Sequence, residues 1–340
     1  MWQLVNHTPF SAERCFARDV QGAEVWLVAV QGTFAVTSDG SLALADEQEP
    51  VNLVPRYNDP GAPSSLMYDS ELALTKPATD ILLRGHAYAP RERPVAHMNV
   101  SLRVNEQAKT LRVTGDRRWR GSLLTTAMTP PEPFLLMPIT YERAFGGGAQ
   151  ANAGPGDMDP RNPVGTGLAS SRERAEGMRL PNVEHPGALI SDWRERPPPA
   201  GYGPIDRSWL PRRERAGTYD AHWFESRKPL WPLDLQERFF QCAPDDQCQH
   251  GLLAGGEPIA LEGLSPRGTL RFCVPKHWLT FRTYFGASPI EHRARLQTII
   301  IEPDVPRVLA VWHTALRCQG RDHLLEKTVI GEKPYVRKGV

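Results

Sequence analysis

The feature that most constrains the fold is one continuous apolar run, Glu24–Val36, with the sequence EVWLVAVQGTFAV. Its β-branched and aromatic side chains occupy successive positions instead of every second one. Because neighbouring residues of a strand point to opposite faces, this run predicts a central strand that is buried on both faces. A turn at Asp39-Gly40 and the alternating Leu42 and Leu44 follow, so the run is expected to open a hairpin.

Further along the chain, shorter segments alternate between apolar and polar residues. The segment 97–104 does so, and after a turn at Asn105-Glu106 the pattern continues through residues 109–115. Strand-like segments return after Leu261 and include a hairpin whose tip lies at residues 303–306. Successive short strands with tight connections favour antiparallel pairing. The sequence therefore predicts a mainly β fold.

The segment 131–240 interrupts this pattern, because glycine, proline and arginine dominate it. A chain of 340 residues is long enough for roughly two domains. We therefore expect two antiparallel, sandwich-like β-rich lobes, residues 1–130 and 241–340, on either side of an irregular central segment, residues 131–240. Two separate sandwiches and one composite sheet system both remain open.

A few short helices are expected inside the central segment or at its end. Ser170 or Ser171 could cap a helix that runs to about residue 178. Asp234 and Glu237 have the spacing of a capping box, which predicts a second helix over residues 234–242.

The stretch 138–184 is the most specific part of the central segment. It lacks the periodicity of a helix or a long strand, and a long irregular stretch in a compact chain is usually functional or disordered. Tyr141, Phe145 and Leu168 argue against disorder, since disordered tracts contain few such residues. An ordered, functional loop is the prediction.

Composition excludes some partners and indicates a compartment. The net charge is +1 and the pI is about 7.7, so nothing draws the chain strongly to nucleic acid or to a membrane surface. Five scattered cysteines form no disulfide framework, which favours reduced thiols. Neither an export signal nor a transmembrane run is visible. We expect a soluble, cytoplasmic protein.

Motifs that would carry chemistry are weak. The chain has no Gly-x-Ser-x-Gly, and Gly146-Gly147-Gly148 resembles a nucleotide-binding fingerprint that no helix follows, so conformational glycines are favoured. Cys242, Cys248 and His250 match no common zinc spacing, and a buried-thiol interpretation is favoured. Asp157 and Asp159, together with Asn152 and Asn162, could bind calcium, although turn residues explain them better. No cofactor or metal is expected.

A cluster of arginines and aromatic residues follows in the central segment. The cluster runs from Trp209 through Arg212, Arg213 and Arg215 to Tyr219 and Trp223, and such combinations occur both in nucleic-acid sites and in protein interfaces. With a net charge near zero, a protein interface or a packed loop is the favoured interpretation.

Several blocks of sequence together resemble one family. They are MWQLVNHTPFSAER, GAEVWLVAVQGTF, TKPATDILLRGHAYAP, LRVTGDRRW, PITYERAFGG, NPVGTG, LPNVE and RKPLWPLDLQERFFQCAPDDQ. The chain is similar to the type VI secretion accessory family of unknown-function domains, numbered 2169. The resemblance implies a cytoplasmic bacterial adaptor or chaperone, without catalytic residues, that helps load a secreted effector protein onto the VgrG/PAAR spike.

An adaptor would present its recognition residues on loops held by a rigid scaffold. The candidates for partner contact are Tyr141, Arg143, Phe145, Asn162, Gly165, Trp209 and Arg212. The alternative is that Tyr141 and Phe145 only anchor the long loop, and this alternative is favoured.

Two other functions stay open. One is a hydrolase with an Asp/His site in the central region, and the other is a carbohydrate-binding β module, which nine tryptophans suggest.

Overall fold

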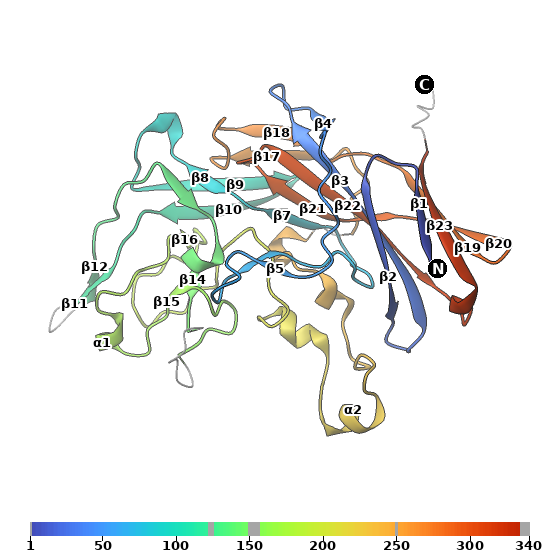
Figure 1. Cartoon of the computed structure of the whole chain (residues 1–340). Helices are drawn as coiled ribbons and strands as arrows, with labels where there is room; N and C mark the ends of the chain where they lie inside the picture. The colour runs from blue at the N-terminus through green and yellow to red at the C-terminus, as the bar shows by residue number, and fades with distance from the viewer. Residues whose placement is uncertain (1, 122–125, 149–156, 249–250, 334–340) are drawn as a thin grey trace.

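A computed structural model describes residues 2–121, 126–148, 157–248 and 251–333 of the chain. These residues form an elongated, mainly β molecule with two short α-helices, α1 (Arg172–Ala175) and α2 (Ala221–Ser226) (Figure 1). The predicted fold class is confirmed. No helix of this described part has both the length and the apolar character needed to cross a membrane.

A six-stranded sheet lies at the centre of the molecule. Its order is β2 (Ser11–Arg18), β3 (Glu24–Val36), β22 (Arg307–Arg317), β21 (Arg295–Glu302) and β7 (Asp80–Leu83), with β4 (Leu42–Leu44) paired to β3. Strand β3 is buried along almost its whole length, as the apolar run predicts. All neighbours are antiparallel except β7 and β21, which run parallel.

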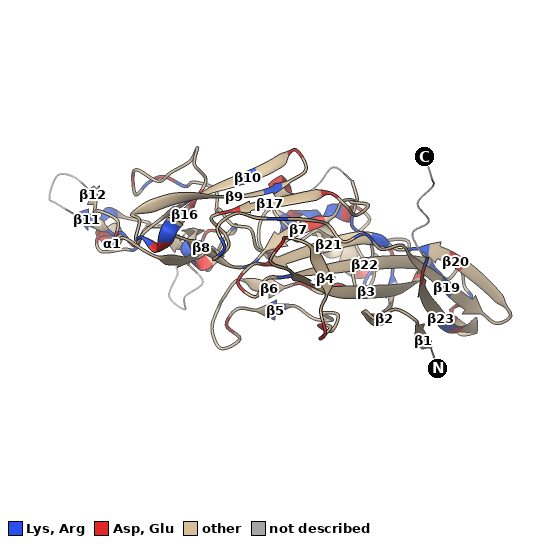
Figure 2. Cartoon of the chain, turned by 90° about the horizontal axis from the view of Figure 1, so that it is seen from above, with Lys and Arg blue, Asp and Glu red and all other residues tan. Residues whose placement is uncertain are grey.

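Two further sheets lie on either side. The five-stranded sheet contains β16 (Val183–Glu184), β10 (Gln107–Thr114), β9 (His97–Val104), β17 (Pro258–Glu262) and β18 (Leu270–Cys273), in that order. The four-stranded sheet contains β1 (Gln3–Asn6), β23 (Leu325–Glu332), β19 (Leu279–Phe285) and β20 (Ser288–Arg293). Seen from above, β9, β10 and β17 form one layer, and β3, β21 and β22 form another (Figure 2).

Short strand pairs and 3₁₀ turns complete the described structure. The pairs are β5 (Arg56–Tyr57) with β6 (Leu66–Tyr68), β8 (His86–Tyr88) with β13 (Leu136–Pro138), β11 (Trp119–Gly121) with β12 (Thr126–Met128), and β14 (Phe145–Gly146) with β15 (Thr166–Gly167). The 3₁₀ turns are Pro90–Glu92, Tyr141–Arg143, Arg212–Ala216, Glu237–Phe240, Asp245–Gln247 and Asp322–Leu324.

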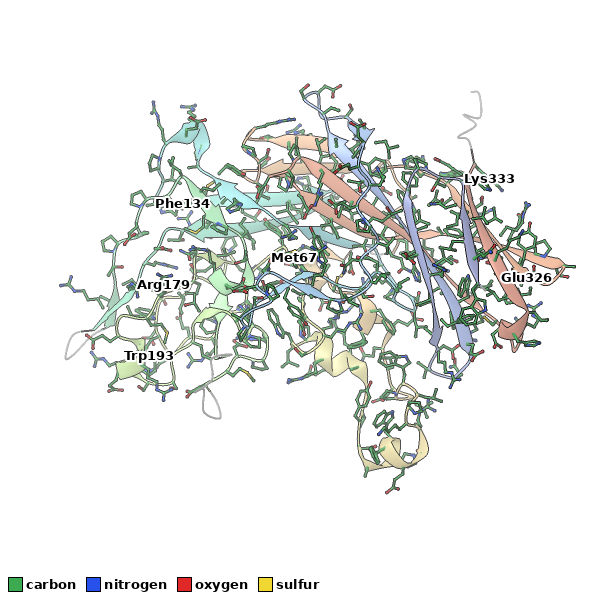
Figure 3. All side chains as sticks on the ribbon, in the orientation of Figure 1. Met67, Phe134, Arg179, Trp193, Glu326 and Lys333 are labelled. Carbon is green, nitrogen blue, oxygen red and sulfur yellow. The ribbon has the colours of Figure 1, made fainter. Side chains whose placement is uncertain are left out.

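Strands from both ends of the chain share all three large sheets. Strand β3 pairs with β22, β9 pairs with β17, and β1 pairs with β23. The composite sheet system is therefore the one that forms, because the two terminal segments complete each other's sheets. Side chains of the two ends of the molecule, Trp193 and Arg179 near α1 and Glu326 and Lys333 near β23, lie far apart (Figure 3).

The two faces of the six-stranded sheet differ in chemistry. One face turns Trp26, Val28 and Val30 of β3 into the main apolar core, which also receives side chains from the other two large sheets. The opposite face carries buried polar side chains, including Thr298 of β21 and His313 of β22. Loop residues 46–79 and part of the central segment cover this second face, which we call the charged face.

The predicted helices have different outcomes. Helix α1 is capped by Ser171, whose hydroxyl accepts a hydrogen bond from the Arg174 amide at 3.3 Å, as expected. The helix predicted over residues 234–242 is wrong, because this region holds only a 3₁₀ turn. Its predicted cap, Asp234, instead accepts hydrogen bonds from the Thr218 amide at 3.0 Å and the Thr218 hydroxyl at 2.7 Å. The carboxylate therefore closes a loop instead of capping a helix.

Candidate functional site

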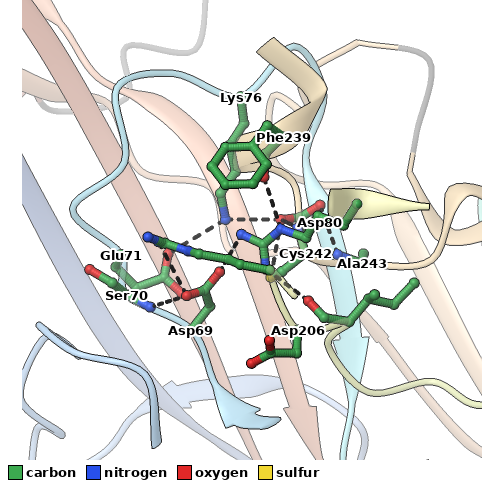
Figure 4. A network of polar contacts seen from close by, with 12 residues as sticks. Asp69, Ser70, Glu71, Lys76, Asp80, Asp206, Phe239, Cys242 and Ala243 are labelled. Carbon is green, nitrogen blue, oxygen red and sulfur yellow. Dashed lines mark hydrogen bonds and ion pairs between the residues drawn. The ribbon is translucent and has the colours of Figure 1, made fainter. Parts of the chain in front are cut away.

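A network of buried charges lies on the charged face of the six-stranded sheet (Figure 4). Its centre is Lys76, whose Nζ lies 2.9 Å from Asp80 Oδ2 and 3.8 Å from Glu71 Oε2. The same ammonium donates a hydrogen bond to the hydroxyl of Thr298 at 2.8 Å. Ionised groups are almost never buried unless they are paired, and each of these three has its partner at hand.

A second cation, Arg212, links the network to the central segment. One of its terminal nitrogens lies 2.5 Å from Asp69 Oδ2, while Nη1 donates to the Ile205 carbonyl at 2.7 Å and Nε to the Phe239 carbonyl at 2.8 Å. Arg207 lies 3.3 Å from the other oxygen of Asp69. The buried guanidinium therefore joins two stretches of the central segment to the loop that contains Asp69.

The pKa shifts follow from burial opposed by charge pairing. Burial disfavours the charged form of Lys76, but the carboxylates of Asp80 and Glu71 outweigh it and raise the pKa of the ammonium. Burial likewise opposes ionisation of Asp69, yet the guanidinium groups of Arg212 and Arg207 hold its pKa below the ordinary value. Burial raises the pKa of Glu71.

Asp80 connects the network to the residues that follow the central segment. Its carboxylate accepts hydrogen bonds from the backbone amides of Cys242 at 3.0 Å and Ala243 at 3.3 Å. Both neighbouring thiols also donate to it, Cys242 at 3.4 Å and Cys248 at 3.7 Å. One carboxylate on β7 thus fixes the path of residues 242–248.

The cysteine side chains agree with the buried-thiol interpretation. Cys242 and Cys248 are free and buried, and burial raises the pKa of both thiols. The third residue of that predicted set, His250, lies outside the described residues. Among the residues that are described, no group of three or more His, Cys, Asp or Glu side chains is arranged to hold a metal ion.

Most of the predicted partner-contact residues face inward. Tyr141, Phe145, Asn162, Trp209 and Arg212 are each at most 5% exposed. The amide of Asn162 donates to the carbonyls of Tyr141 at 2.7 Å and Phe145 at 3.0 Å, and the rings of Tyr141 and Trp209 meet edge to face at 5.6 Å. These contacts are those of an anchor that holds the long loop on the sheets.

The glycines and Arg143 complete the anchor. Gly146 has a φ of 148°, and a Cβ there would lie 2.1 Å from the Asn162 carbonyl oxygen, so a conformational glycine is required. At Gly165 a Cβ would lie 2.4 Å from the Asn162 amide nitrogen. Arg143 is half-buried and donates to Asn182 Oδ1 at 3.0 Å. The structure thus brings Gly165 and Arg143 into the same loop framework as Asn162.

Sequence reasoning singled out Tyr219 and Trp223 but missed the rest of an exposed part of the central segment, which we call the projecting arm (residues 217–235). Helix α2 lies at its tip and stands away from the sheets (Figure 1). Tyr219, Phe224 and Leu233 are 50%, 61% and 70% exposed, although all three are large and apolar. The predicted cluster of arginines and aromatic residues reaches into the arm, and it indicated a protein interface or a packed loop.

The projecting arm has a defined internal structure. Trp223 donates through its indole nitrogen to the Leu230 carbonyl at 2.8 Å, and Arg227 donates to the Val20 carbonyl at 2.5 Å. At the base, the amide of Gln236 donates to the Arg215 carbonyl at 3.0 Å. The arm is therefore closed at its base and tied to the turn between β2 and β3.

Comparison with known protein families identifies a match. The model of a family described as an uncharacterized protein conserved in bacteria (DUF2169) matches residues 21–313, which is most of the chain. No curated protein and no solved structure matches.

Proposed function

We propose, from the premise that the chain belongs to DUF2169, an uncharacterized family conserved in bacteria, that this protein is a non-enzymatic adaptor. It binds a secreted effector protein and helps to load it onto the VgrG/PAAR spike of a type VI secretion system in the cytoplasm. The specific system and partners come from the sequence resemblance. The observation that carries the proposal is the exposed apolar surface of the projecting arm.

The chemistry of the arm suits a protein partner. Phe224 and Leu233 are 61% and 70% exposed, and Lys228 places its ammonium 4.5 Å from the centre of the Phe224 ring. Exposed apolar groups that are rimmed by polar ones mark surfaces that other proteins cover. Aromatic anchors of this kind contribute much of the binding energy in protein interfaces.

The charged face supports this role because it fixes both ends of the arm. Arg212 lies just before the arm and donates to the carbonyl of Phe239, just after it. Asp69 pairs with this arginine from beneath, at 2.5 Å. A surface that is already ordered loses less conformational entropy when it binds, so the buried charges favour affinity without touching the partner.

The alternative functions find less support in the described contacts. Only Trp2 and Trp278 are highly exposed among the nine tryptophans, whereas a carbohydrate platform needs several aligned rings. A hydrolase would need an aspartate that orients a histidine, and Asp220 is the nearest aspartate to His222 in the sequence. Its carboxylate instead accepts from the Trp223 amide at 2.8 Å and caps α2.

The test is co-purification from the native bacterium of the full chain with effector and spike proteins. We expect the wild-type chain to retain both and the double variant Phe224→Ser, Leu233→Ser to lose most of the effector. Both side chains are exposed, so folding is expected to be unaffected. Circular dichroism of each variant checks that it is folded.

A control variant removes two exposed apolar side chains outside the arm. Val54 and Val305 are 63% and 59% exposed and lie outside the arm, so Val54→Ser, Val305→Ser should retain the effector. Equal loss in the two double variants would contradict the role of the arm. Unchanged effector delivery after deletion of the whole gene would contradict the adaptor function itself.

A further inference from the structure

A cavity of about 640 Å³ lies on the charged face, at the corner of the six-stranded sheet where β21 begins. His313 and Thr314 of β22 and Arg295 of β21 line it. The returning strand of the projecting arm forms part of its wall through Leu233 and Leu235. Its size is that of small-molecule sites, which are concave and mostly preformed.

His313 is the unusual residue of this cavity. It is 1% exposed, and neither of its ring nitrogens has a hydrogen-bond partner among the described residues. A neutral imidazole offers one donor and one acceptor, and buried polar atoms are almost always partnered. By contrast His292, which also lines the cavity, is fully engaged, with Thr283 at 2.8 Å and Thr314 at 2.7 Å.

Unpaired positive charge lies beside this imidazole. Arg295 is directly opposite His313 in the β21–β22 ladder, so the two side chains stand on the same face of the sheet. Arg293 also lines the cavity, and within the described residues neither guanidinium forms an ion pair or a hydrogen bond. Arg317 differs, because Asp19 holds it at 2.7 Å.

The other side chains that line the cavity determine its net charge and its apolar surface. Glu237 and Asp19 are the acidic side chains among them, and Asp19 is already paired. Leu74 and Phe240 add apolar surface. The cavity therefore combines an excess of guanidinium groups, an unpartnered imidazole and an apolar wall.

We propose that this cavity binds a small organic oxyanion, with its charged group between Arg295, Arg293 and His313 and its apolar body against Leu74 and Phe240. The planar guanidinium matches carboxylate and phosphate oxygens. The imidazole N–H supplies a further donor to the same group. This site is independent of the adaptor function and would remain if that proposal failed.

The test is an NMR titration of the full chain with ¹⁵N-labelled histidine, using three probes with one phenyl ring each: benzoate, phenyl phosphate and the uncharged benzamide. Loss of a signal in His313→Gln assigns the imidazole. We expect benzoate or phenyl phosphate, or both, to shift the His313 signals saturably. The probe that binds identifies the headgroup as carboxylate or phosphate, and benzamide should cause no saturable shift.

The arginine variants then locate the binding. Arg295→Gln should weaken the binding of the charged probe by about tenfold or more, because it removes a charge-assisted hydrogen bond. Arg282→Gln is the matched control, since Arg282 pairs with Glu291 at 2.6 Å and does not line the cavity. The proposal is overturned if neither anion shifts His313, if benzamide shifts it equally, or if Arg295→Gln binds as tightly as the wild type.

Discussion

One face of the six-stranded sheet packs Trp26, Val30 and Ile299 into an apolar core, whereas the other buries Lys76 and Asp80 beneath the central segment. Along β3, β21 and β22 both faces are largely buried. The apolar face is held by non-directional burial, which tolerates small rearrangements. The charged face is held by directional ion pairs, each of which depends on its partner.

The difference explains what each face contributes. Apolar burial joins three sheets into one body without specifying how an irregular segment must run. The ion pair between Asp69 and Arg212 specifies that path, and the hydrogen bond that the Cys242 amide donates to Asp80 fixes the residues just after it. We therefore assign the joining of the three sheets to the apolar face and the position of the central segment to the charged face.

The largest expected effect is on the charged face. Lys76→Met leaves the carboxylates of Asp80 and Glu71 buried without their cation, and breaking such a pair destabilises by about 3–5 kcal/mol. Urea denaturation of the variant measures the loss. The triple variant with Asp80→Asn and Glu71→Gln should recover part of the stability, since no unpaired charge remains. A loss as large in the triple variant would contradict the ion-pair explanation.

Acid should also lower the stability through His292, which stacks on Phe281 of the main core and is hydrogen-bonded to Thr314. Burial lowers the pKa of His292 to about 4, below the 6.5 of an exposed histidine. As the pH falls, the histidine is therefore protonated in the unfolded state before it is protonated in the folded state. Its contribution to the free energy of unfolding is complete above pH 6.5 and is lost as the pH falls to about 4. The loss is on the order of 3 kcal/mol.

The pH prediction is checked by urea denaturation of the wild type and His292→Gln at pH 7 and pH 4.5. The difference in unfolding free energy between the two proteins should shrink toward the lower pH. A difference that grows as the pH falls would show that the histidine is charged in the folded state.

A smaller effect is expected from the apolar face. Ile299→Val removes one methylene from a fully buried side chain in the main core, which should lower the unfolding free energy by about 1 kcal/mol. Thermal unfolding measures it. If Ile299→Val lowered the unfolding free energy as much as Lys76→Met does, the two faces would not differ in their sensitivity to substitution.

The smallest effect is expected for a charge pair on the surface. Arg282 and Glu291 lie 2.6 Å apart, but their side chains are 52% and 65% exposed, so water and salt already screen them. Arg282→Gln should leave the thermal midpoint within experimental error. A clear decrease in the thermal midpoint would mean that exposed ion pairs stabilise the protein as much as buried ones do.

The contrast also explains what could be predicted from the sequence. Strand β3 and the hairpins of residues 97–114 and 295–317 follow from local periodicity, and the structure confirms them. The parallel pairing of β1 with β23 could not be predicted, because it joins residues more than three hundred positions apart.

The charged face also could not be predicted from the sequence, because its residues are far apart in the chain. Asp69, Lys76 and Arg212 are ordinary polar residues in sequence, and only the tertiary path of the chain brings them together. Arg212 was singled out, but as a partner contact, since sequence patterns do not distinguish a buried arginine from an exposed one. The anchoring alternative for Tyr141 was available from sequence because a long ordered loop needs buried aromatic residues.

Hydrogen exchange of the Asp69→Asn variant tests most directly whether the charged face positions the central segment. The substitution keeps the shape of the side chain but removes the charge that faces Arg212. The account predicts that the Ile205 and Arg213 amides, which are hydrogen-bonded in the wild type, exchange about tenfold faster or more, while amides of β9 and β19 keep their protection. Unchanged exchange in the central segment, or equal acceleration in all three sheets, would contradict it.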